Sequence, residues 1–351
     1  MPSKEDLKAL QSESLERKIL ITQTRIIEWY LHYKGQVYVS FSGGKDSTVL
    51  LHIARQCFPD IEAVFADTGL EYPEIRGFVK SFENVTIVKP KMQFKEVIER
   101  YGYPVISKEV ADTIHGARVS IKHNRDTYRV KKIQGRLFDK DGKKSIYNIE
   151  KWGTLMDAPF KIAGDCCHIM KKTPLINFSK TLNKKAIIGT MTGESRLRES
   201  KWLKFGCNSF DQVDAQSTPL SFWTEQDVLH YIKNYNLPYC SVYGELVNKS
   251  DFIGQLSMDD VPTDLMMTGC QRTGCMFCMF GVHLEKEPNR FQKMKLTHPK
   301  QYDYCIRESY SGFKKKTEIV NGELIITDTD EIIEYKGLGL GKVLDFIGVK
   351  Y

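Results

Sequence analysis

The chain lacks any apolar run long enough to cross a bilayer, which requires about 20 residues in a row. Its first residues, MPSKEDLKAL, contain no apolar core of the kind that signal peptides carry. Internal repeats and low-complexity segments are also missing. These absences predict a globular protein of the cytoplasm that does not enter a membrane.

A strong excess of charge of one sign is missing as well. The 351 residues include 51 Lys and Arg and 44 Asp and Glu, which leaves a net charge of +7. Such a modest excess suits anionic substrates in general and does not by itself indicate nucleic acid. A hydrophobic share of 41% is ordinary for a globular chain, and the length suggests two domains or one enlarged domain.

What the chain does contain is a glycine-rich turn suited to holding phosphate. It follows a strand-like run, Gln36–Phe41, and leads into an apolar helical run, Thr48–Arg55. Glycines let backbone N–H groups approach phosphate oxygens closely, and the helix dipole favours the negative charge. A lysine adds a mobile cation, and serines add hydroxyl donors. The residues of this turn are Ser42, Gly43, Gly44, Lys45, Asp46 and Ser47.

The turn is not a Walker A loop, because that motif has Ser or Thr after the lysine, where this chain has Asp46. It resembles the PP-loop of the ATP pyrophosphatases, enzymes that split ATP between the α and β phosphates. The resemblance implies that residues 42–47 bind a nucleotide and that Lys45 and Asp46 take part in catalysis. Asp46 has a second interpretation as the N-cap of the following helix.

Strand-like runs alternate with helical patterns over much of the chain. The runs Tyr38–Phe41, Ile61–Phe65 and Val85–Val88 are separated by helical patterns, and a further run covers Ala186–Ile188. This alternation predicts an α/β fold with a parallel sheet covered on both faces. Ligands of such sheets bind at the carboxyl ends of the strands, where residues 42–47 fall. The resemblance implies the same PP-loop (adenine nucleotide alpha-hydrolase-like) domain.

We expect a PP-loop domain over residues 1–240 and a cysteine-cluster region with a tail over residues 241–351. Between about 115 and 161 the alternation breaks down and basic residues accumulate, which suggests an insertion with a hairpin tip at Lys140–Gly142. The insertion is either a solvated charged loop or a clamp for phosphate or nucleic acid. In the tail, two β-rich runs flank Gly322 and predict a hairpin.

A second turn, Asp67–Gly69, comes shortly after the run that ends at Phe65. Together with Tyr72-Pro73-Glu74 it resembles the ATP sulfurylase small subunit. In those proteins the turn ends the second strand beside the nucleotide, so the resemblance places Asp67 near the adenosine or a Mg²⁺ ion. Magnesium is also expected on physical grounds, because it neutralises triphosphate charge while needing few protein ligands.

A further candidate for anion binding runs from Gly189 to Ser200 (GTMTGESRLRES). It resembles the segment of the sulfonucleotide reductases in which a Thr-Gly turn and an Arg-x-x-Glu-Ser motif bind the phosphosulfate. In the expected register Arg196 is the motif arginine and Glu199-Ser200 is the acidic pair, although the arginine expected three residues later is Leu203. An exposed, charged helix start is the alternative. The site residues implied here are Gly193, Arg196 and Arg198.

Nine cysteines in a cytoplasmic chain are expected to stay reduced, so disulfides are not predicted. Two clusters stand out, the adjacent pair Cys166 and Cys167 and the group Cys270, Cys275 and Cys278. Clustering of this kind indicates metal or redox chemistry. The other cysteines are expected to be buried small hydrophobic residues, and they are Cys57, Cys207, Cys240 and Cys305.

The segment Cys166–Leu175 resembles the tandem-cysteine segment of the assimilatory adenylylsulfate reductases. Those enzymes complete a [4Fe–4S] cluster with a distant Cys-x-x-Cys, and four thiolates suit such a cluster. A structural zinc site or no metal are the alternatives. Cys270 would replace one ligand or face the cluster. The implied ligands are Cys166, Cys167, Cys275 and Cys278.

Two departures from the reductases bear on the reaction. Reductases attack the sulfate with a cysteine near the C-terminus in a Glu-Cys-Gly-Leu-His setting, whereas the last cysteine here, Cys305, lacks those neighbours. As a family they also usually carry a loop without the lysine, because their substrate has no β–γ pyrophosphate. Retention of Lys45 therefore favours ATP.

Three functions follow from these patterns. The first is an ATP-binding enzyme of the phosphoadenylylsulfate (PAPS) reductase family that carries a [4Fe–4S] cluster and Mg²⁺, releases pyrophosphate and serves sulfur transfer. The second is a sulfonucleotide reductase with Cys305, another thiol or a partner protein as nucleophile, and the third is a non-catalytic nucleotide and redox sensor. The implied partners are an adenine nucleotide and a sulfur donor or thiol reductant protein, and a nucleic-acid acceptor stays open.

Overall fold

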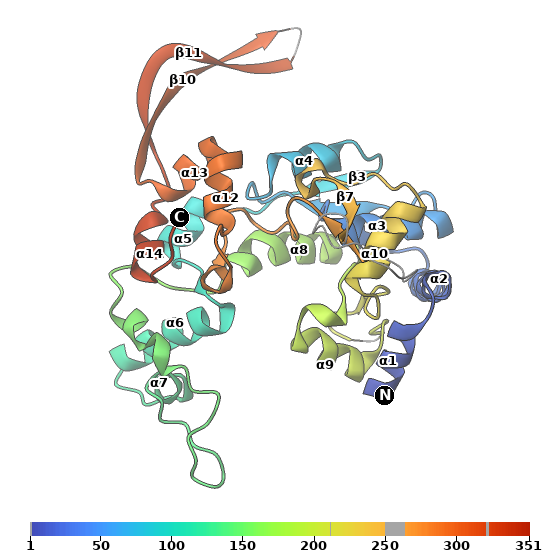
Figure 1. Ribbon diagram of the computed structural model, residues 1–351, viewed down its shortest axis with the longest axis horizontal. Coiled ribbons are helices and arrows are strands. Elements are labelled where there is room, and N and C mark those ends of the chain that lie inside the picture. Colours follow the sequence, from blue (N-terminus) through green and yellow to red (C-terminus); the bar gives the residue numbers. More distant parts are fainter. Residues whose placement is uncertain (1, 211, 250–263, 321–322) are drawn as a thin grey trace. The chain divides into compact units, whose positions relative to one another are not determined.

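The computed structural model of the protein describes residues 2–210, 212–249, 264–320 and 323–351 (Figure 1). The described chain packs as two compact units, each made of two stretches. The first unit comprises Met1–Lys91 and Ile169–Cys275, and the second comprises Met92–His168 and Met276–Tyr351. This division differs from the linear one expected near residue 240, because the chain leaves the first unit after Lys91 and returns to it at Ile169.

A five-stranded parallel sheet forms the centre of the first unit, in the order β3-β2-β1-β5-β6. The prediction of an α/β fold with a parallel sheet is confirmed, and the four predicted strands all lie in this sheet. Apolar side chains of its strands are buried against the helices, for example Val39 of β1. The strands are β1 (Val37–Ser40), β2 (Ala63–Ala66), β3 (Val85–Val88), β5 (Lys185–Ile188) and β6 (Gln216–Ser217).

Helices cover the sheet of the first unit. α2, α3 and α10 pack against one another, and α8 packs on β2 and β3 (Figure 1). The helices are α1 (Lys4–Ser12), α2 (Leu15–His32), α3 (Lys45–Cys57), α4 (Pro73–Lys80), α8 (Thr173–Thr181), α9 (Arg196–Phe205) and α10 (Glu225–Asn234), and β7 (Leu246–Asn248) pairs antiparallel with β8 (Leu265–Met267).

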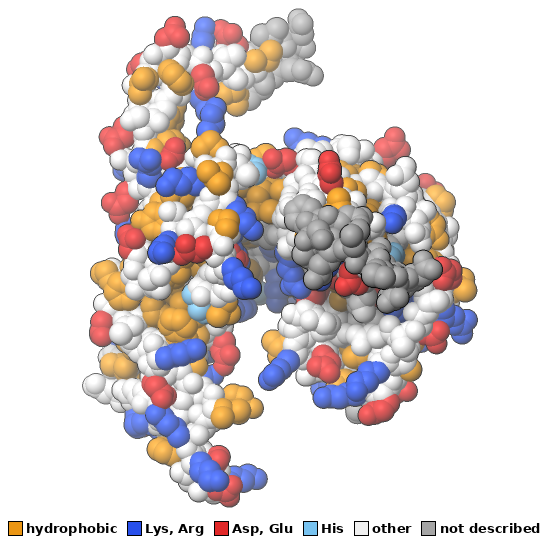
Figure 2. Space-filling view, viewed as in Figure 1, with side chains coloured by type: hydrophobic (Ala, Val, Ile, Leu, Met, Phe, Trp, Pro, Cys, Tyr) orange, Lys and Arg blue, Asp and Glu red, His pale blue; other side chains and the backbone are white. Residues whose placement is uncertain are grey.

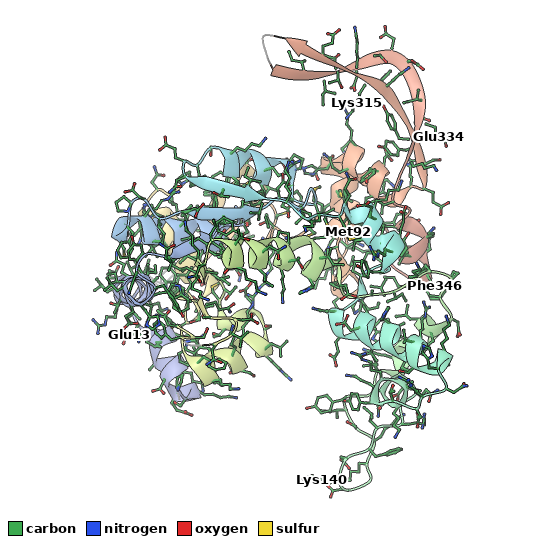
Figure 3. All side chains as sticks on the ribbon, turned by 180° about the vertical axis from the view of Figure 1, so that it is seen from behind. Glu13, Met92, Lys140, Lys315, Glu334 and Phe346 are labelled. Carbon is green, nitrogen blue, oxygen red and sulfur yellow. The ribbon has the colours of Figure 1, made fainter. Side chains whose placement is uncertain are left out.

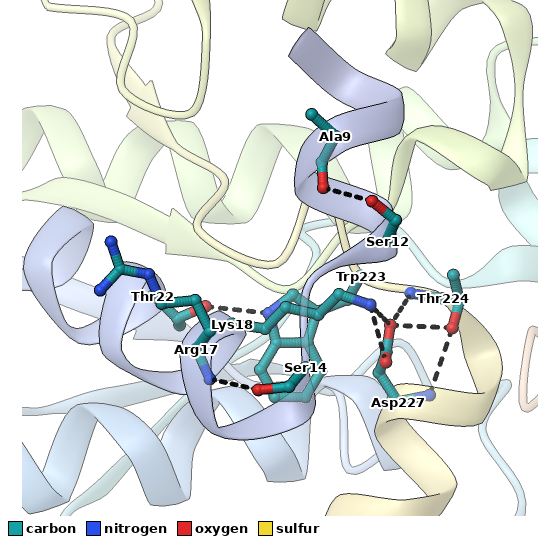
Figure 4. Close-up of polar contacts among 9 residues, drawn as sticks. All are labelled: Ala9, Ser12, Ser14, Arg17, Lys18, Thr22, Trp223, Thr224 and Asp227. Atoms are coloured by element: carbon teal, nitrogen blue, oxygen red, sulfur yellow. Dashed lines mark hydrogen bonds and ion pairs between the residues drawn. The ribbon is translucent and has the colours of Figure 1, made fainter. Parts of the chain in front are cut away.

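Two polar contacts join α2 to the start of α10 (Figure 4). Lys18, only 2% exposed, donates from Nζ to both carboxylate oxygens of Asp227 at 2.8 and 2.7 Å. The indole N–H of Trp223 donates to Thr22 Oγ1 at 2.9 Å. A buried ion pair contributes more to the orientation of its elements than to net stability. These contacts therefore fix where α10 begins, and its first residue, Glu225, reaches the loop after β1.

The second unit combines helices, short strands and a long β-ribbon. The backbone of Tyr103 exchanges hydrogen bonds with residues 161–163, and β4, which follows it, pairs in parallel with β9. The elements are α5 (Phe94–Arg100), β4 (Val105–Ile106), α6 (Lys108–Lys122), α7 (Tyr128–Ile133), β9 (Met279–Phe280), α12 (Arg290–Thr297), α13 (Pro299–Ile306), β10 (Ser309–Val320), β11 (Glu323–Lys336) and α14 (Gly341–Phe346).

The region from about 115 to 161 is more regular than the sequence suggested. α6 continues through His115 to Lys122: its buried residues, among them Val110, Ile114 and Ala117, recur at helical spacing, whereas Val119 and Ile121 near its end are exposed. The turn at Lys140–Gly142 is present, but only one bridge, between Phe138 and Lys144, closes it (Figure 3).

The predicted hairpin of the tail is confirmed and is longer than expected. β10 and β11 pair antiparallel from Ser309 and Lys336 to Val320 and Glu323. Lys315 and Glu334 lie along this curved ribbon (Figure 3). Gly322, expected in the turn, lies outside the described residues.

The sheet order brings two loops to the same edge. The chain runs from β1 to β2 on one side and returns to β5 on the other side of β1, so the order reverses between β1 and β5. Ligands of open parallel sheets bind at this point of reversal. Residues 42–47 follow β1, and Gly189 follows β5. A Cβ atom on Gly189 would lie 3.2 Å from the carbonyl oxygen of Asp46, so the two loops touch.

Gly43→Ala is expected to lower the free energy of unfolding by roughly 1–3 kcal/mol. Gly43 has a φ of +71°, and a Cβ atom there would lie 2.7 Å from Cγ2 of Val79 and 3.0 Å from Cγ2 of Ile75. Urea unfolding followed by circular dichroism measures the change. Gly77→Ala is the control, because a Cβ on this exposed position of α4 meets nothing within 4 Å, and it should stabilise by roughly 0.5–1 kcal/mol. Equal losses in both variants would contradict the steric role of Gly43.

Candidate nucleotide site and cysteine segments

The loop after β1 is shaped by hydrogen bonds among its own residues. The Ser42 N–H donates to Ser47 Oγ at 3.2 Å, and the Gly44 N–H donates to Ser42 Oγ at 3.3 Å. Ser47 Oγ donates to the Gly44 carbonyl at 2.9 Å. Gly44 is the N-cap of α3, so the loop ends where the first N–H groups of the helix have no acceptor within the helix. Such a turn presents backbone donors to an anion.

Lys45 is 4% exposed and contacts segments from later in the first unit. Its Nζ donates to the Gln271 carbonyl at 2.9 Å and lies 3.1 Å from Oε1 of Glu225. Its backbone N–H donates to the Tyr243 hydroxyl at 3.2 Å, and that hydroxyl lies 2.7 Å from Thr273 Oγ1. The lysine therefore lies beside the loop with its charge balanced by groups that the sequence motif did not indicate.

Asp46 is not the helix N-cap that one interpretation expected. Gly44 takes that position, and Asp46 lies one residue inside the first turn of α3. Its Oδ1 is buried without a hydrogen-bond partner among the described residues. Burial raises the pKa of this carboxyl group, and the nearby Lys45 ammonium opposes that rise. The N-cap interpretation of Asp46 is therefore wrong, and its role as a ligand stays a prediction.

The turn after β2 is held by two acidic side chains. Asp67, 8% exposed, accepts from Arg76 Nη2 at 2.9 Å and from the Gly69 N–H at 3.1 Å. Glu71 accepts from the Thr68 N–H at 3.0 Å, and Lys171 Nζ lies 3.5 Å from it. Asp67 thus lies in the turn after β2 with its carboxylate already paired, and its place near the adenosine or a Mg²⁺ ion stays a prediction. Sequence reasoning missed Glu71 and Lys171, because neither belongs to a short motif.

A pocket opens at the carboxyl ends of β1 and β2. Its apolar wall is made by Phe41, Phe65, Ile75 and Leu175, and its rim is polar. Apolar walls with a few polar groups are typical of sites for planar organic ligands such as a nucleobase. The polar residues of the rim are Ser42, Glu71, Lys171 and Thr273.

Of the two arginines expected in the segment after β5, Arg198 is the more buried. Arg196 is exposed at the first position of α9, whose N-cap is Ser195. Arg198 is half-buried and pairs with Glu194, which also accepts from the Met191 N–H at 2.9 Å. Burial and the nearby Arg272 lower the pKa of Arg198, whereas Asp46 raises it.

This geometry fits a different register of the reductase motif. Glu194-Ser195 can serve as its acidic pair, and the arginine expected three residues later is then Arg198. In this register Met191 takes the place of the preceding arginine. The sequence contained one signal for this register: Arg198 follows Ser195 by the three residues that the motif requires.

The cysteine segments lie in both units. Cys166, Cys167 and Cys278 belong to the second unit, and Cys275 is the last residue of the first. The sulfur atoms of Cys166 and Cys167 are 4.0 Å apart, and the Cys278 carbonyl accepts from Arg290 Nη1 at 3.0 Å. Within either unit, the described residues include no group of three His, Cys, Asp or Glu side chains placed to hold a metal ion. The four-cysteine site therefore stays a prediction.

Two further cysteines were candidates for chemistry. Cys270 lies in the first unit, and its Sγ is 3.5 Å from the Tyr72 hydroxyl. Cys305 is 0% exposed, and burial raises the pKa of its thiol well above the usual range. A thiolate is the nucleophilic form of cysteine, so this setting disfavours Cys305 as a nucleophile.

Much of the basic charge expected to form a clamp is neutralised within the second unit. The Arg118 guanidinium donates to four backbone carbonyls, those of Leu155, Met156, Ala158 and Phe160. Other cations form ion pairs: Lys132 with Glu109, Arg136 with Asp126 and Lys144 with Glu150. On the face shown in Figure 2, basic and acidic side chains are interspersed on this unit. These contacts favour a structural role for Arg118, Lys132 and Arg136 of the predicted clamp.

Comparison with known proteins identifies the family. A model of the phosphoadenosine phosphosulfate reductase domain matches residues 36–109 and 121–280, more than half of the chain. The chain belongs to this family. The match includes the loop at 42–47, the turns after β2 and β5 and both cysteine segments. The resemblance expected from the sequence is confirmed.

Several curated relatives carry the name adenosine 5'-phosphosulfate reductase. One from Bacillus thuringiensis is 24% identical over 216 residues, covering 61% of this chain and 70% of the relative. One from Staphylococcus epidermidis is 25% identical over 226 residues, covering 63% and 70%. The protein MJ0973 of Methanocaldococcus jannaschii is 37% identical over 97 residues, which are 26% of this chain and 23% of that protein. The chain therefore matches less than a quarter of MJ0973.

A solved structure also matches this member of the phosphoadenosine phosphosulfate reductase domain family. It is a PAPS reductase from Candida auris in complex with phosphate, 16% identical, with a TM-score of 0.35 and coverage of 75% of this chain and 98% of that one. No helix in the described part of the chain is long and apolar enough to cross a membrane.

Proposed function

We propose that this family member binds ATP and cleaves it between the α and β phosphates in the service of sulfur transfer. An acceptor oxygen attacks the α-phosphorus, an adenylate forms, and pyrophosphate leaves. The observation that carries the proposal is the complete Ser42–Ser47 loop with its buried cation, Lys45, at the carboxyl end of β1. A lysine at this place neutralises a β–γ pyrophosphate, a group that adenylylsulfate does not have.

The proposed placement of ATP follows from the two loops and the pocket. The pyrophosphate rests against the N–H and hydroxyl donors of residues 42–47. The adenine enters the pocket between Phe41 and Phe65. Arg198, which lies in the segment after β5 close enough to Asp46 for their charges to interact, offsets charge that develops at the α-phosphate. In this proposal Arg198 takes the role that the sequence register gave to Arg196.

Lys45 is free to change partners when the nucleotide binds. Glu225 is 53% exposed, so its ion pair with Lys45 is screened by water and is worth little. The Gln271 carbonyl is the other acceptor. A polyphosphate carries more negative charge than the Glu225 carboxylate or the Gln271 carbonyl, so it draws the Lys45 ammonium toward the loop. Binding of ATP is therefore expected to loosen the segment around Gln271.

The loop contains a carboxylate oxygen that suits a magnesium ion. The buried Oδ1 of Asp46 has no hydrogen-bond partner among the described residues, and a carboxylate oxygen is a preferred ligand of Mg²⁺. One protein carboxylate together with phosphate oxygens is a common arrangement for this ion. When bound, magnesium would neutralise the triphosphate charge.

The resemblance of the two cysteine segments to those of the adenylylsulfate reductases supports an iron–sulfur cluster as part of the proposal. Cys167, Cys275 and Cys278 are each partly exposed, and Cys166 is adjacent to Cys167. Four thiolates suit a [4Fe–4S] cluster, whereas a small tetrahedral zinc ion is harder to bind with two adjacent cysteines. A bound cluster would supply redox or sulfur chemistry.

Arg198→Met is expected to lower kcat/KM for pyrophosphate release by about 10- to 100-fold, the cost of one charge-assisted hydrogen bond. Arg196→Met on the same helix is the matched control and should change it little, because Arg196 is exposed. Steady-state assays with ATP and Mg²⁺ measure both variants. A larger loss of kcat/KM in Arg196→Met than in Arg198→Met would instead favour the register in which Arg196 is the motif arginine.

Purified protein incubated with ATP and Mg²⁺, and separately with adenylylsulfate, tests the proposed function. We expect pyrophosphate and AMP, or an adenylate, from ATP once an acceptor is supplied. Sulfite from adenylylsulfate without pyrophosphate from ATP would instead identify a sulfonucleotide reductase. Tight binding of ATP without turnover, across a panel of oxygen acceptors, would indicate a nucleotide sensor.

A further inference from the structure

The net positive charge of the chain is concentrated in one segment of the second unit. Residues 117–151 include 11 of the 51 Lys and Arg but only 4 of the 44 Asp and Glu, so the rest of the chain carries 40 of each. The excess within the segment therefore equals the net charge of +7 of the whole chain. The segment runs from the last turns of α6 through α7 to the short helix that begins at Glu150. A local excess of this kind attracts a polyanion.

The carboxylates of this segment leave several of its cations without an ion pair. Asp126 pairs with Arg136, and Glu150 pairs with Lys144. Asp139 accepts the N–H groups of residues 141 and 143 at 3.0 and 2.8 Å, so its carboxylate shapes the turn. The exposed cations of the segment with no ion pair among the described residues, called the unpaired cations below, are Lys122, Arg125, Arg129, Lys140 and Lys143. Unpaired surface cations of this kind can neutralise phosphate groups.

The parts of the segment are tied together at their bases. α6 and α7 pack against one another, and Thr127 Oγ1 donates to Ser120 Oγ at 3.0 Å. Arg136 Nη2 lies 2.5 Å from Oδ1 of Asp126, which joins the chain leading into the turn to the loop before α7. The turn extends beyond this base, with Lys140 at its tip (Figure 3). The unpaired cations therefore belong to one continuous region of the second unit.

Three aromatic side chains are exposed among these cations. Tyr128, Phe138 and Tyr147 are 59%, 63% and 65% exposed, whereas no other described aromatic side chain exceeds the 53% of Phe313. Aromatic faces beside cations are the means by which proteins hold the bases of a single strand. In a duplex the bases are stacked on one another, so their faces are closed to side chains. The combination therefore favours a single strand over a duplex.

The turn is suited to nucleic acid rather than to a lipid surface. Its tip, residues 139–144 (DKDGKK), is charged at every position except the glycine. The exposed apolar side chains Phe138 and Ile146 lie on either side of this tip and not at its end. A tip that enters lipid is apolar, because carboxylates such as those of Asp139 and Asp141 would lose their water there. A single strand instead offers phosphates to the lysines and bases to the rings.

We infer that residues 117–151 bind single-stranded nucleic acid, with its phosphates against the unpaired cations and its bases on Tyr128, Phe138 and Tyr147. The inference goes beyond the proposed function and does not depend on it, because the segment belongs to the second unit and the proposed ATP site to the first. It takes up the clamp interpretation of the basic insertion, with the clamp built from the unpaired cations.

Fluorescence anisotropy of the full chain with fluorescein-labelled RNA and DNA of mixed sequence tests the inference. Strands of about 20 nucleotides exceed the roughly 4–16 that one such surface covers. We expect single strands to bind, with log K falling against log salt at a slope of roughly −3, since the unpaired cations contact about four phosphates. Lys140→Met combined with Lys143→Met should weaken binding about 10-fold and make the slope shallower by roughly 1. Lys314→Met combined with Lys315→Met is the matched control and should change neither, because these exposed lysines lie on β10.

The aromatic rings are tested separately from the charge. Tyr147→Ala should weaken binding by about 5- to 100-fold, the loss of one stacked base, whereas Tyr147→Phe keeps the ring and should bind as tightly as the unsubstituted protein. Because Tyr147 is exposed, the melting temperature should stay unchanged in both variants.

Binding of RNA or of DNA supports the inference, and the tighter of the two identifies the strand. The inference is overturned if neither strand binds, if duplex DNA binds as tightly as single strands, or if the double lysine variant and Tyr147→Ala bind normally. Stronger binding to phosphatidylserine vesicles than to either strand would also overturn it and indicate a membrane surface. Lys45→Met should bind the strands normally, so a failure of this inference and a failure of the proposed function can be told apart.

Discussion

Lys45→Met is expected to lower the rate of pyrophosphate release from ATP by about 100- to 1,000-fold, the effect of removing one preorganised group that stabilises transition-state charge. Methionine keeps most of the length of the buried stem and removes only the ammonium group. The loop itself should survive, because its shape depends on Gly43, on Gly44 and on the hydroxyl pair of Ser42 and Ser47, which are 3.0 Å apart. A continuous assay of pyrophosphate under saturating ATP and Mg²⁺ measures the loss.

Two controls separate the charge of Lys45 from its packing. Lys34→Met removes a lysine of the turn before β1 and should leave turnover unchanged. Glu225→Gln removes the carboxylate 3.1 Å from Lys45 and should leave kcat within a few-fold, because that ion pair is half exposed to water. Full activity of Lys45→Met, with an unchanged melting temperature, would refute ATP cleavage by this loop.

The sequence predicted the central sheet because each strand is short, apolar and followed by its own helix. The loop at 42–47 was predictable for the same reason: glycine before a helix start and a strand before the glycine leave few other conformations. The steric need for Gly43 could not be read in this way. It arises from Ile75 and Val79 on α4, which are distant in sequence and pack against the loop.

The site beyond that loop depends on contacts of long sequence separation. Lys45 meets Gln271 and Tyr243 only because the chain returns to the first unit at Ile169. No local pattern signals such a return, and for the same reason the division at residue 240 differs from the units observed. Both Arg196 and Arg198 were expected in the site, but the sequence could not rank them, since two Glu-Ser pairs compete for one motif and only the start of α9 at Arg196 shows that Arg198 is the more buried of the two.

The isolated cysteines could be predicted from composition. A cysteine far from any motif is most often a small buried hydrophobic residue, as Cys240 is at 1% exposure, where burial also raises the pKa of the thiol. Cys207 is also buried and belongs to the same hydrophobic core.

Cys278→Ser is expected to abolish the iron centre. The proposed ligands come from two remote segments, and Cys278 lies directly before β9, whose pairing with β4 fixes its backbone. Loss of one thiolate from four leaves an incomplete site, so iron should fall from about four atoms per chain to less than about one. Anaerobic purification followed by iron and acid-labile sulfide analysis, with optical spectra, measures the change.

Cys57→Ser is the matched control, because Cys57 ends α3 away from both cysteine clusters, and it should keep full iron and sulfide. One zinc per chain without sulfide in the unsubstituted protein would favour the structural zinc alternative, since thiolates bind either metal. Iron retained at the normal level in Cys278→Ser would remove this residue from the ligand set.

Pyrophosphate release measured on the same Cys278→Ser sample then shows whether the first unit works without the cluster. Because residues 42–47 and the pocket at the ends of β1 and β2 lie in that unit, we expect ATP cleavage to persist while sulfur transfer is lost.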